Sequence, residues 1–194
     1  MVGIGQKLTE ISLNDVFGGM LEKAKKPVAA AFQYAIVSLL AYLIAFYTVG
    51  ALPGQGDLNG IGAMWAVISG IIVFQASWAT TIGTASLRIL GSFVGAVVSA
   101  LYLSFLPFSP LGMAAMIGLT VLVCLAFGIP DHARLAAITV AVIMVFSTLN
   151  PDVPPAINAT LRFSEVIVGS AVAVGVFWIW TKLFKDRGND QKTG

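Results

Sequence analysis

The sequence predicts an all-α polytopic membrane protein with six transmembrane helices. Hydrophobic residues make up 58% of the 194 residues and charged residues only 10%, whereas soluble domains are roughly 45–50% apolar and about 25% charged. The mean hydropathy is +0.91. A soluble fold could not bury this much apolar surface, so we expect one membrane domain with the lipid bilayer as its surroundings.

Six apolar stretches, separated by Gly-rich, Pro-rich or charged residues, have the composition of bilayer spans. They cover residues 28–49, 61–78, 88–106, 111–127, 134–149 and 162–184. Together they predict a transmembrane domain at 27–185. Residues 1–26 mix charges with apolar residues at roughly helical spacing, which predicts a cytoplasmic amphipathic helix on the membrane surface or a partly ordered leader. Residues 186–194 are expected to form a cytoplasmic tail.

The distribution of Lys and Arg predicts that both termini are cytoplasmic. If the six stretches cross the bilayer, ten of the 11 Lys and Arg residues lie on one side, and only Arg162 lies on the other. Cytoplasmic loops carry an excess of these residues. Because the basic charge gathers at the chain ends and in two short loops, it indicates membrane topology and gives no reason to expect nucleic-acid binding.

A short internal repeat predicts two inverted three-helix units. At an offset of 74 residues, Leu-Arg-Ile-Leu-Gly-Ser-Phe-Val-Gly at 87–95 aligns with Leu-Arg-Phe-Ser-Glu-Val-Ile-Val-Gly at 161–169. Chance similarity is the alternative explanation. An odd number of spans would invert the second unit, and inverted repeats in transporters hold the substrate near the midplane between them. This inversion places Arg88 on the cytoplasmic side and Arg162 on the outer side.

Arg88 and Arg162 are predicted to stand where two spans begin. Exposed backbone N–H groups and the helix dipole favour an anion at such a position, so the two arginines are candidates for an anion pathway. Alternatively, each reaches a lipid phosphate or pairs with an acidic residue for packing. Glu165 lies one helical turn after Arg162 and shares its face. A carboxylate at that depth must be paired or protonated, which makes Glu165 either a structural partner of Arg162 or a proton-coupling candidate.

The stretch between the second and third spans is polar but uncharged before its closing arginine. It is too polar for lipid and too apolar for an ordinary loop, which favours a broken helix lining a cavity. Its ligand-contact candidates are Gln75, Thr80, Thr81 and Thr84. Trp65 and Trp78 either stack on an aromatic ligand or serve as anchors at the membrane interface.

Other residues have narrower expected roles. His132 lies in the predicted cytoplasmic turn after the fourth span, where an imidazole could relay protons or have no special function. Small residues at four-residue intervals let helices approach closely, either within the chain or at a dimer interface. These packing candidates are Gly91, Gly95, Ser99, Gly169 and Ala173.

The chemistry of an enzyme or a metalloprotein is not expected. Cys124 is the only cysteine and His132 the only histidine, so one chain cannot assemble a disulfide framework or a Cys/His metal site. No nucleophile–base pair is visible in the sequence. We therefore expect no cofactor and no enzymatic activity.

Several motifs resemble those of the fusaric acid resistance and aromatic acid exporter superfamily. They are Trp-Ala-Val-Ile-Ser-Gly-Ile-Ile-Val-Phe-Gln at 65–75, Arg-Ile-Leu-Gly-Ser-Phe-Val-Gly-Ala at 88–96, and Arg-Phe-x-Glu-x-x-x-Gly at 162–169. The resemblance covers about 28–184, and the matching positions are Gln75, Arg88, Gly91, Gly95, Arg162 and Glu165. Ser92 stands where Thr is usual, and we expect a single six-span unit without the large cytoplasmic domain of many relatives.

This resemblance implies a transporter of the bacterial inner membrane that exports organic anions, with aromatic carboxylates and proton coupling as candidates. Its expected partners are a small organic anion, the lipid bilayer and a second copy of the chain in a homodimer. Two alternatives remain at this point. One is a passive organic-anion channel, as in the distantly similar plant malate channels, and the other is a non-transporting membrane scaffold or subunit.

Overall fold

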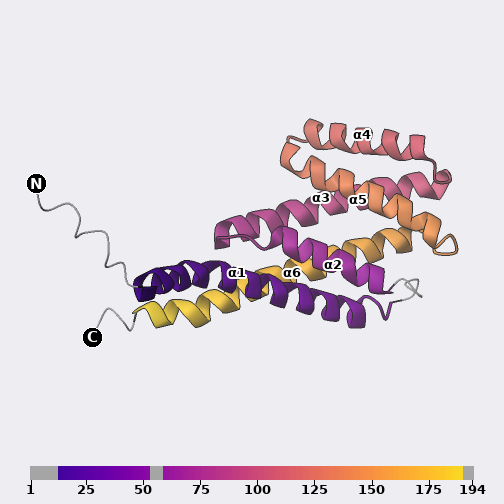
Figure 1. The fold of residues 1–194 in the computed structure, drawn as a ribbon. Helices are drawn as coiled ribbons and strands as arrows, with labels where there is room; N and C mark the ends of the chain where they lie inside the picture. Colours follow the sequence, from indigo (N-terminus) through magenta and orange to yellow (C-terminus); the bar gives the residue numbers. More distant parts are fainter. Residues whose placement is uncertain (1–12, 53–58, 190–194) are drawn as a thin grey trace, which may run out of the picture. The chain divides into compact units, whose positions relative to one another are not determined.

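The computed structural model describes residues 13–52 and 59–189, with side chains described for 27–52 and 59–183. Throughout the described ranges the regular structure is helical (Figure 1), which confirms the all-α prediction for these residues. The helices are α1 (Leu13–Thr48), α2 (Asn59–Val73), α3 (Trp78–Phe105), α4 (Pro110–Ala126), α5 (Pro130–Leu149) and α6 (Pro155–Asn189). Parts of the predicted terminal segments, residues 1–12 and 190–194, lie outside the described residues.

Four of these helices are long and apolar enough to cross a membrane, which supports a polytopic membrane protein. The candidate spans are Pro27–Thr48 of α1, Trp78–Phe105, Pro130–Leu149 and Pro155–Leu183 of α6. The apolar helices α2 and α4 have only 15 and 17 residues. At 1.5 Å per residue they are about 22 and 26 Å long, shorter than the roughly 30 Å hydrocarbon core.

Helices α3 and α6 begin well before the two arginines, so the prediction that Arg88 and Arg162 open their spans is wrong. Arg88 lies ten residues after Trp78, and Arg162 lies seven residues after Pro155. Pro155 suits the first turn of α6, because the N–H that proline lacks is not needed there. The hydropathy pattern favoured later starts because polar residues interrupt the first turns, namely Thr80 and Thr81 in α3 and Asn158 in α6.

The break between α2 and α3 is also shorter than predicted. It covers only residues 74–77. The Ser77 hydroxyl accepts a hydrogen bond from the Thr80 backbone N–H, and the Thr80 hydroxyl accepts one from the Ser77 backbone N–H. This capping box satisfies two backbone donors at the helix start. The predicted broken helix over residues 75–88 is therefore wrong, because most of this stretch belongs to α3.

The chain divides into two compact units, residues 1–35 and 36–194. In the first unit, residues 13–35 belong to α1, with Pro27 inside the helix and the Phe32 side chain exposed. In the second unit, α6 packs along α2 and α3, α3 also packs along α5, and α4 packs on α5 (Figure 1). The arrangement leaves α3 and α6 in contact with each other at the centre of this unit.

Two clusters of small buried side chains hold the helices of the second unit together. One consists of Ala41, Ala45, Ala63 and Ala66 of α1 and α2, packed against Val168 and Val172 of α6. The other consists of Cys124, Ala133 and Ala136 of α4 and α5, packed against Val94 of α3. Dispersion contacts between closely packed helices replace the hydrophobic effect as the main source of helix association in lipid.

The predicted packing glycines lie where these helices approach most closely. A Cβ atom on Gly95 of α3 would lie 2.8 Å from the Thr139 Cβ of α5. A Cβ on Gly169 of α6 would lie 2.9 Å from the Ser69 Cβ of α2 and would collide with the Ala66 carbonyl oxygen. Gly91 likewise faces α5, 2.9 Å from the His132 carbonyl oxygen when measured from such a Cβ. These glycines set contacts within the chain.

The other two predicted packing residues are also buried. The Ser99 hydroxyl donates to the Gly95 carbonyl oxygen at 2.8 Å, within α3. Ala173 of α6 belongs to a cluster with Val37 of α1 and Val73 of α2. All five small residues therefore take part in contacts inside the described part of the chain.

Replacing Gly169 by Ala should destabilise the protein. The added methyl group would force α2 and α6 apart, and overpacking of this kind costs about 1–3 kcal/mol. Thermal unfolding in detergent would measure the change. Gly175→Ala is the matched control on the same helix, because its Cβ would have no atom within 4 Å. A Gly169→Ala protein as stable as Gly175→Ala would contradict the close-contact interpretation.

Candidate functional site

Three charged side chains are buried among the residues whose side chains are described. Arg88 of α3 is 2% exposed, Arg162 of α6 is 4% exposed, and Glu165 of α6 is fully buried. Charged residues inside membrane spans are rare and expensive, and by default they mark substrate, ion or proton pathways. These three residues therefore define the candidate site.

Arg88 and Arg162 line the same small cavity. Its walls come from four helices and are formed by Trp65, Arg88, Ile138, Thr139, Val142, Arg162 and Val166. The space open to the centre of a water molecule is about 10 Å³, roughly what one water needs. The prediction that the two arginines lie on opposite sides of the membrane is wrong, because their positions within α3 and α6 bring them together.

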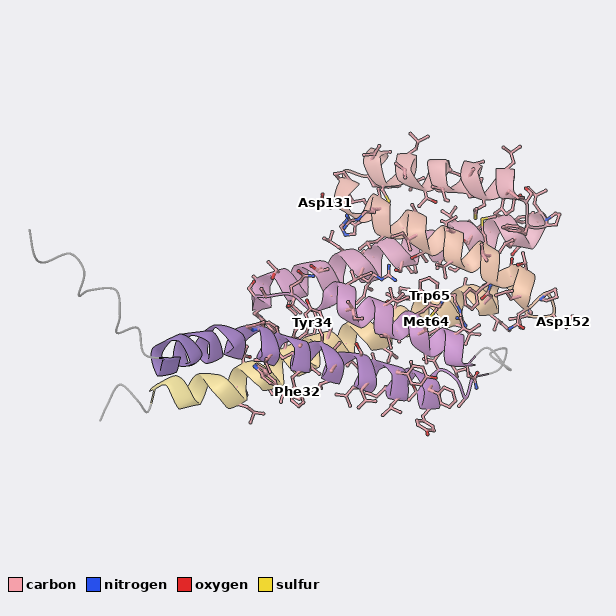
Figure 2. All side chains as sticks on the ribbon, in the orientation of Figure 1. Phe32, Tyr34, Met64, Trp65, Asp131 and Asp152 are labelled. Carbon is pink, nitrogen blue, oxygen red and sulfur yellow. The ribbon has the colours of Figure 1, made fainter. Side chains whose placement is uncertain are left out.

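The cavity lies at the middle of two of its helices. Trp65 is next to Ala66, the central residue of the 15-residue α2, and Thr139 is central in the 20-residue α5. Figure 2 shows Trp65 along α2, Asp131 at the start of α5 and Asp152 in the turn between α5 and α6. In a bilayer, the middle of a spanning helix is where a charge is least tolerated.

Arg162 is held by an acidic partner and an aromatic ring. Its Nη2 atom lies 3.0 Å from the Glu165 Oε1 atom, one helical turn away. Its Cζ atom lies 4.4 Å from the centroid of the Phe146 ring of α5, within the range of a cation–π interaction. The Phe146 ring in turn meets the Trp65 ring edge to face, with centroids 6.3 Å apart.

Arg88 has a weaker set of partners. Its Nε and Nη2 atoms donate to the Ser69 hydroxyl of α2 at 3.3 and 3.1 Å. Within the described part of the chain, its buried Nη1 atom has no hydrogen-bond partner, and no carboxylate forms an ion pair with it. A single neutral hydroxyl therefore faces a full positive charge, although buried charges are normally paired.

A second unused donor belongs to the same cavity. The Trp65 Nε1 atom is buried and has no hydrogen-bond partner among the described residues. The Thr139 hydroxyl, by contrast, donates to the Leu135 carbonyl oxygen at 2.9 Å and lies 3.1 Å from the Ser92 hydroxyl. Indole and guanidinium groups can only donate. Two residues that line the cavity thus carry N–H donors without acceptors in the described part of the chain, an arrangement suited to an anion.

A comparison with known protein families agrees with the resemblance noted in the sequence. The family model described as fusaric acid resistance protein-like matches residues 40–176, which include every residue that lines the cavity. The chain belongs to this family. Neither the curated proteins nor the solved structures compared with the chain gave a match. Together with the apolar helices, the family assignment indicates a membrane protein of transport or resistance.

The four predicted polar ligand contacts of this family member lie in the break before α3 or in the first two turns of α3, and none lines the cavity. Gln75 fills the break before α3, where its Nε2 atom donates to the Ile72 carbonyl oxygen at 2.7 Å. Thr80 belongs to the capping box, and the Thr84 hydroxyl donates to the Thr80 carbonyl oxygen at 2.8 Å. These side chains thus bond to backbone groups at the end of α2 and the start of α3, and the Thr81 hydroxyl accepts a hydrogen bond from the Gln75 backbone N–H.

Trp78 and His132 also lie outside the cavity lining. Trp78 is 45% exposed at the first residue of α3, and its ring centroid lies 6.0 Å from that of Phe177. His132 is half-buried in the first turn of α5. Among the described residues, no group of three or more His, Cys, Asp or Glu side chains could hold a metal ion.

The sequence interpretation named Glu165 as a partner of Arg162 but missed Ser69 and Phe146. Ser69 gave a weak signal, because a hydroxyl inside an apolar span often faces another helix. Phe146 gave none, because it is one apolar residue among many. Only the packing of α2, α5 and α6 around α3 brings these side chains to the charges.

Replacing Glu165 by Gln should destabilise the protein. The variant keeps the shape of the side chain but leaves the buried Arg162 without its acidic partner, and the loss of one partner of a buried ion pair costs about 3–5 kcal/mol. Thermal unfolding in detergent at neutral pH is the measurement. Asp131→Asn, which neutralises an exposed carboxylate, is the control. If both variants unfold at the temperature of the wild type, the ion pair does not stabilise the fold.

Proposed function

We propose that the protein transports organic anions, aromatic carboxylates among them, across a bacterial inner membrane, and that Arg88 and Arg162 form its anion site. The observation that carries this proposal is the burial of Arg88 opposite a single hydroxyl. The carboxylate of a substrate would supply the negative charge that a buried guanidinium requires. Export is the direction that membership of a resistance family favours.

We also propose that the membrane domain consists of two inverted three-helix repeats, α1–α3 and α4–α6, with both termini in the cytoplasm. Matching helix contacts in the two halves of the chain support the repeats. Gly95 packs on Ala136 and Thr139, while Gly169 packs on Ala66 and Ser69. The alanine pairs of the two clusters, 63 with 66 and 133 with 136, occupy equivalent places. The short helices α2 and α4 would cross the bilayer with help from flanking residues or local thinning.

The interior placement of the arginines also sharpens the charge asymmetry. With Arg88 and Arg162 inside the bundle, the remaining nine of the 11 Lys and Arg residues all fall on the proposed cytoplasmic side of a six-span chain. The positive-inside rule counts residues near the ends of the spans. No basic residue then remains on the proposed outer side.

Transport by this site requires movement of the helices. A cavity with about 10 Å³ for the centre of a water cannot admit an aromatic ring. We propose that the two repeats rock against each other about the arginines, as inverted repeats allow. Val142, Trp65 and Ile138 form the apolar walls that would have to separate.

Glu165 is our candidate for proton coupling. Among the described side chains it is the only buried carboxylate. Protonation would cancel the attraction of Glu165 for Arg162. Arg162 would then be available to the substrate anion, so the binding of a proton would favour the binding of the anion. His132 is half-buried in the first turn of α5 and does not line the cavity, which makes it the weaker candidate.

We also propose that two copies of the chain act together as a homodimer. A passive organic-anion channel remains the second candidate, because the same buried arginines would also attract a diffusing anion. The scaffold alternative is less favoured, since the small residues that it would need for a partner are used in contacts within the chain.

Uptake of benzoate into liposomes containing the purified protein would test the anion site. We expect Arg88→Ala to reduce the initial rate at least ten-fold, because the substrate charge loses its main buried partner. Arg134→Ala, which removes an exposed arginine of α5, is the control. Equal rates in the two variants, or no carboxylate uptake by the wild type, would contradict the proposal.

The same liposomes would distinguish a carrier from a channel. With Glu165 as the proton carrier, an imposed pH gradient should accelerate the benzoate uptake that exceeds uptake by protein-free liposomes in the wild type but not in Glu165→Gln. Benzoate exchange without a gradient should persist in the variant. A wild-type uptake rate that does not change with the pH gradient would favour the passive channel.

A further inference from the structure

We infer that the site selects monovalent carboxylates, that Arg88 and Trp65 bind the carboxylate group, and that Glu165 limits the charge which the site accepts. This inference rests on the proposed transport function and adds to it the charge of the substrate and the residues that receive it. It follows from three observations: the sum of the buried charges, the unequal state of the two arginines, and the unused N–H of Trp65.

The sum of the buried charges determines which charge of a substrate anion the site prefers. Two guanidinium groups, Arg88 and Arg162, and one carboxylate, Glu165, are the charged side chains buried in the described part of the chain, so their sum is +1. In a low-dielectric interior the most stable complex is the one closest to neutral. A monovalent anion brings the site to zero, whereas a divalent anion leaves an excess negative charge at the middle of α2 and α5.

The two arginines are not equivalent receptors. Arg162 already faces Glu165 at 3.0 Å and stacks on Phe146, so its charge is largely offset. Arg88 is hydrogen-bonded only to Ser69, and its Nη1 has no hydrogen-bond partner among the described residues. An incoming carboxylate therefore gains most from Arg88 as long as Glu165 is ionised and paired with Arg162 beside it.

Trp65 supplies the second hydrogen bond. Its buried Nε1 has no acceptor in the described part of the chain, and it lines the same cavity as Arg88. Its ring is already engaged edge to face with Phe146. A carboxylate has two oxygens and can accept from two groups at once. The indole N–H from α2 and the guanidinium from α3 would then hold one carboxylate between two helices.

Selectivity for charge can be measured with three ligands that share a ring. Benzoate is monovalent, terephthalate is divalent, and monomethyl terephthalate has the length of terephthalate with a single charge. After subtraction of the flux into protein-free liposomes, through which the neutral acids diffuse, we expect benzoate and monomethyl terephthalate to enter with the wild-type protein at least ten-fold faster than terephthalate. Equal rates for all three would overturn the inference but leave the proposed transport intact. No uptake of any of them would overturn both.

Variants of the ion pair test the role of Glu165. Glu165→Gln raises the charge of the site to +2 and should shift the terephthalate-to-benzoate ratio at least ten-fold towards terephthalate. The double variant Arg162→Gln/Glu165→Gln returns the sum to +1, and its ratio should match that of the wild type even if its rate is lower. An unchanged ratio in Glu165→Gln, or a shifted ratio in the double variant, would show that charge does not set the selectivity.

Trp65→Phe provides a test that leaves the charges untouched. The phenyl ring keeps an aromatic surface against Phe146 but removes the N–H, so the KM for benzoate should rise about ten-fold, as for the loss of one hydrogen bond to a charged group. The preference for benzoate over terephthalate should stay. Trp78→Phe, at the exposed start of α3, is the matched control. A Trp65→Phe protein with the KM of the wild type would exclude Trp65 as a donor to the substrate.

Discussion

A positive charge in the interior of an apolar helical bundle has few ways of remaining there. Water is scarce at that depth, and lipid offers no acceptor, so each guanidinium depends on what the neighbouring helices bring to it. Arg162 forms an ion pair with Glu165 and stacks on Phe146, while Arg88 donates only to the Ser69 hydroxyl in the described part of the chain. This difference between the two arginines is the basis of the anion site that we propose.

Close helix packing makes the arrangement possible. Gly95 and Gly169 let α5 and α2 approach the two central helices nearly to backbone contact. Without that approach, Ser69 would lie too far from Arg88, and Thr139 too far from Ser92, for the hydrogen bonds that join these helices. The glycines thus act on the site indirectly, because they determine how near the polar groups of α2 and α5 come to α3 and α6.

Much of the fold could be predicted from the sequence because hydropathy and helix-breaking residues act locally. The start of α3 could not be predicted from the same local signals, because the polar capping box of Ser77 and Thr80 resembles a loop when only polarity is considered. Arg88, Arg162 and Glu165 could be singled out as candidates from the sequence, since charged residues stand out in an apolar chain. Their meeting at one cavity could not, because it depends on the register between helices that are far apart in sequence.

The unequal lengths of the helices have a consequence for the surrounding lipid. Helix α2 is about 22 Å long, whereas the 28 residues of α3 reach about 42 Å. A long hydrophobic helix tilts, and a short one draws the two leaflets together, which is the response to hydrophobic mismatch. Beside α2 the bilayer would then be thinner than elsewhere. Since Trp65 stands at the centre of that helix, an anion on its way to the arginines would cross less hydrocarbon, and the membrane itself would lower the electrostatic barrier to transport.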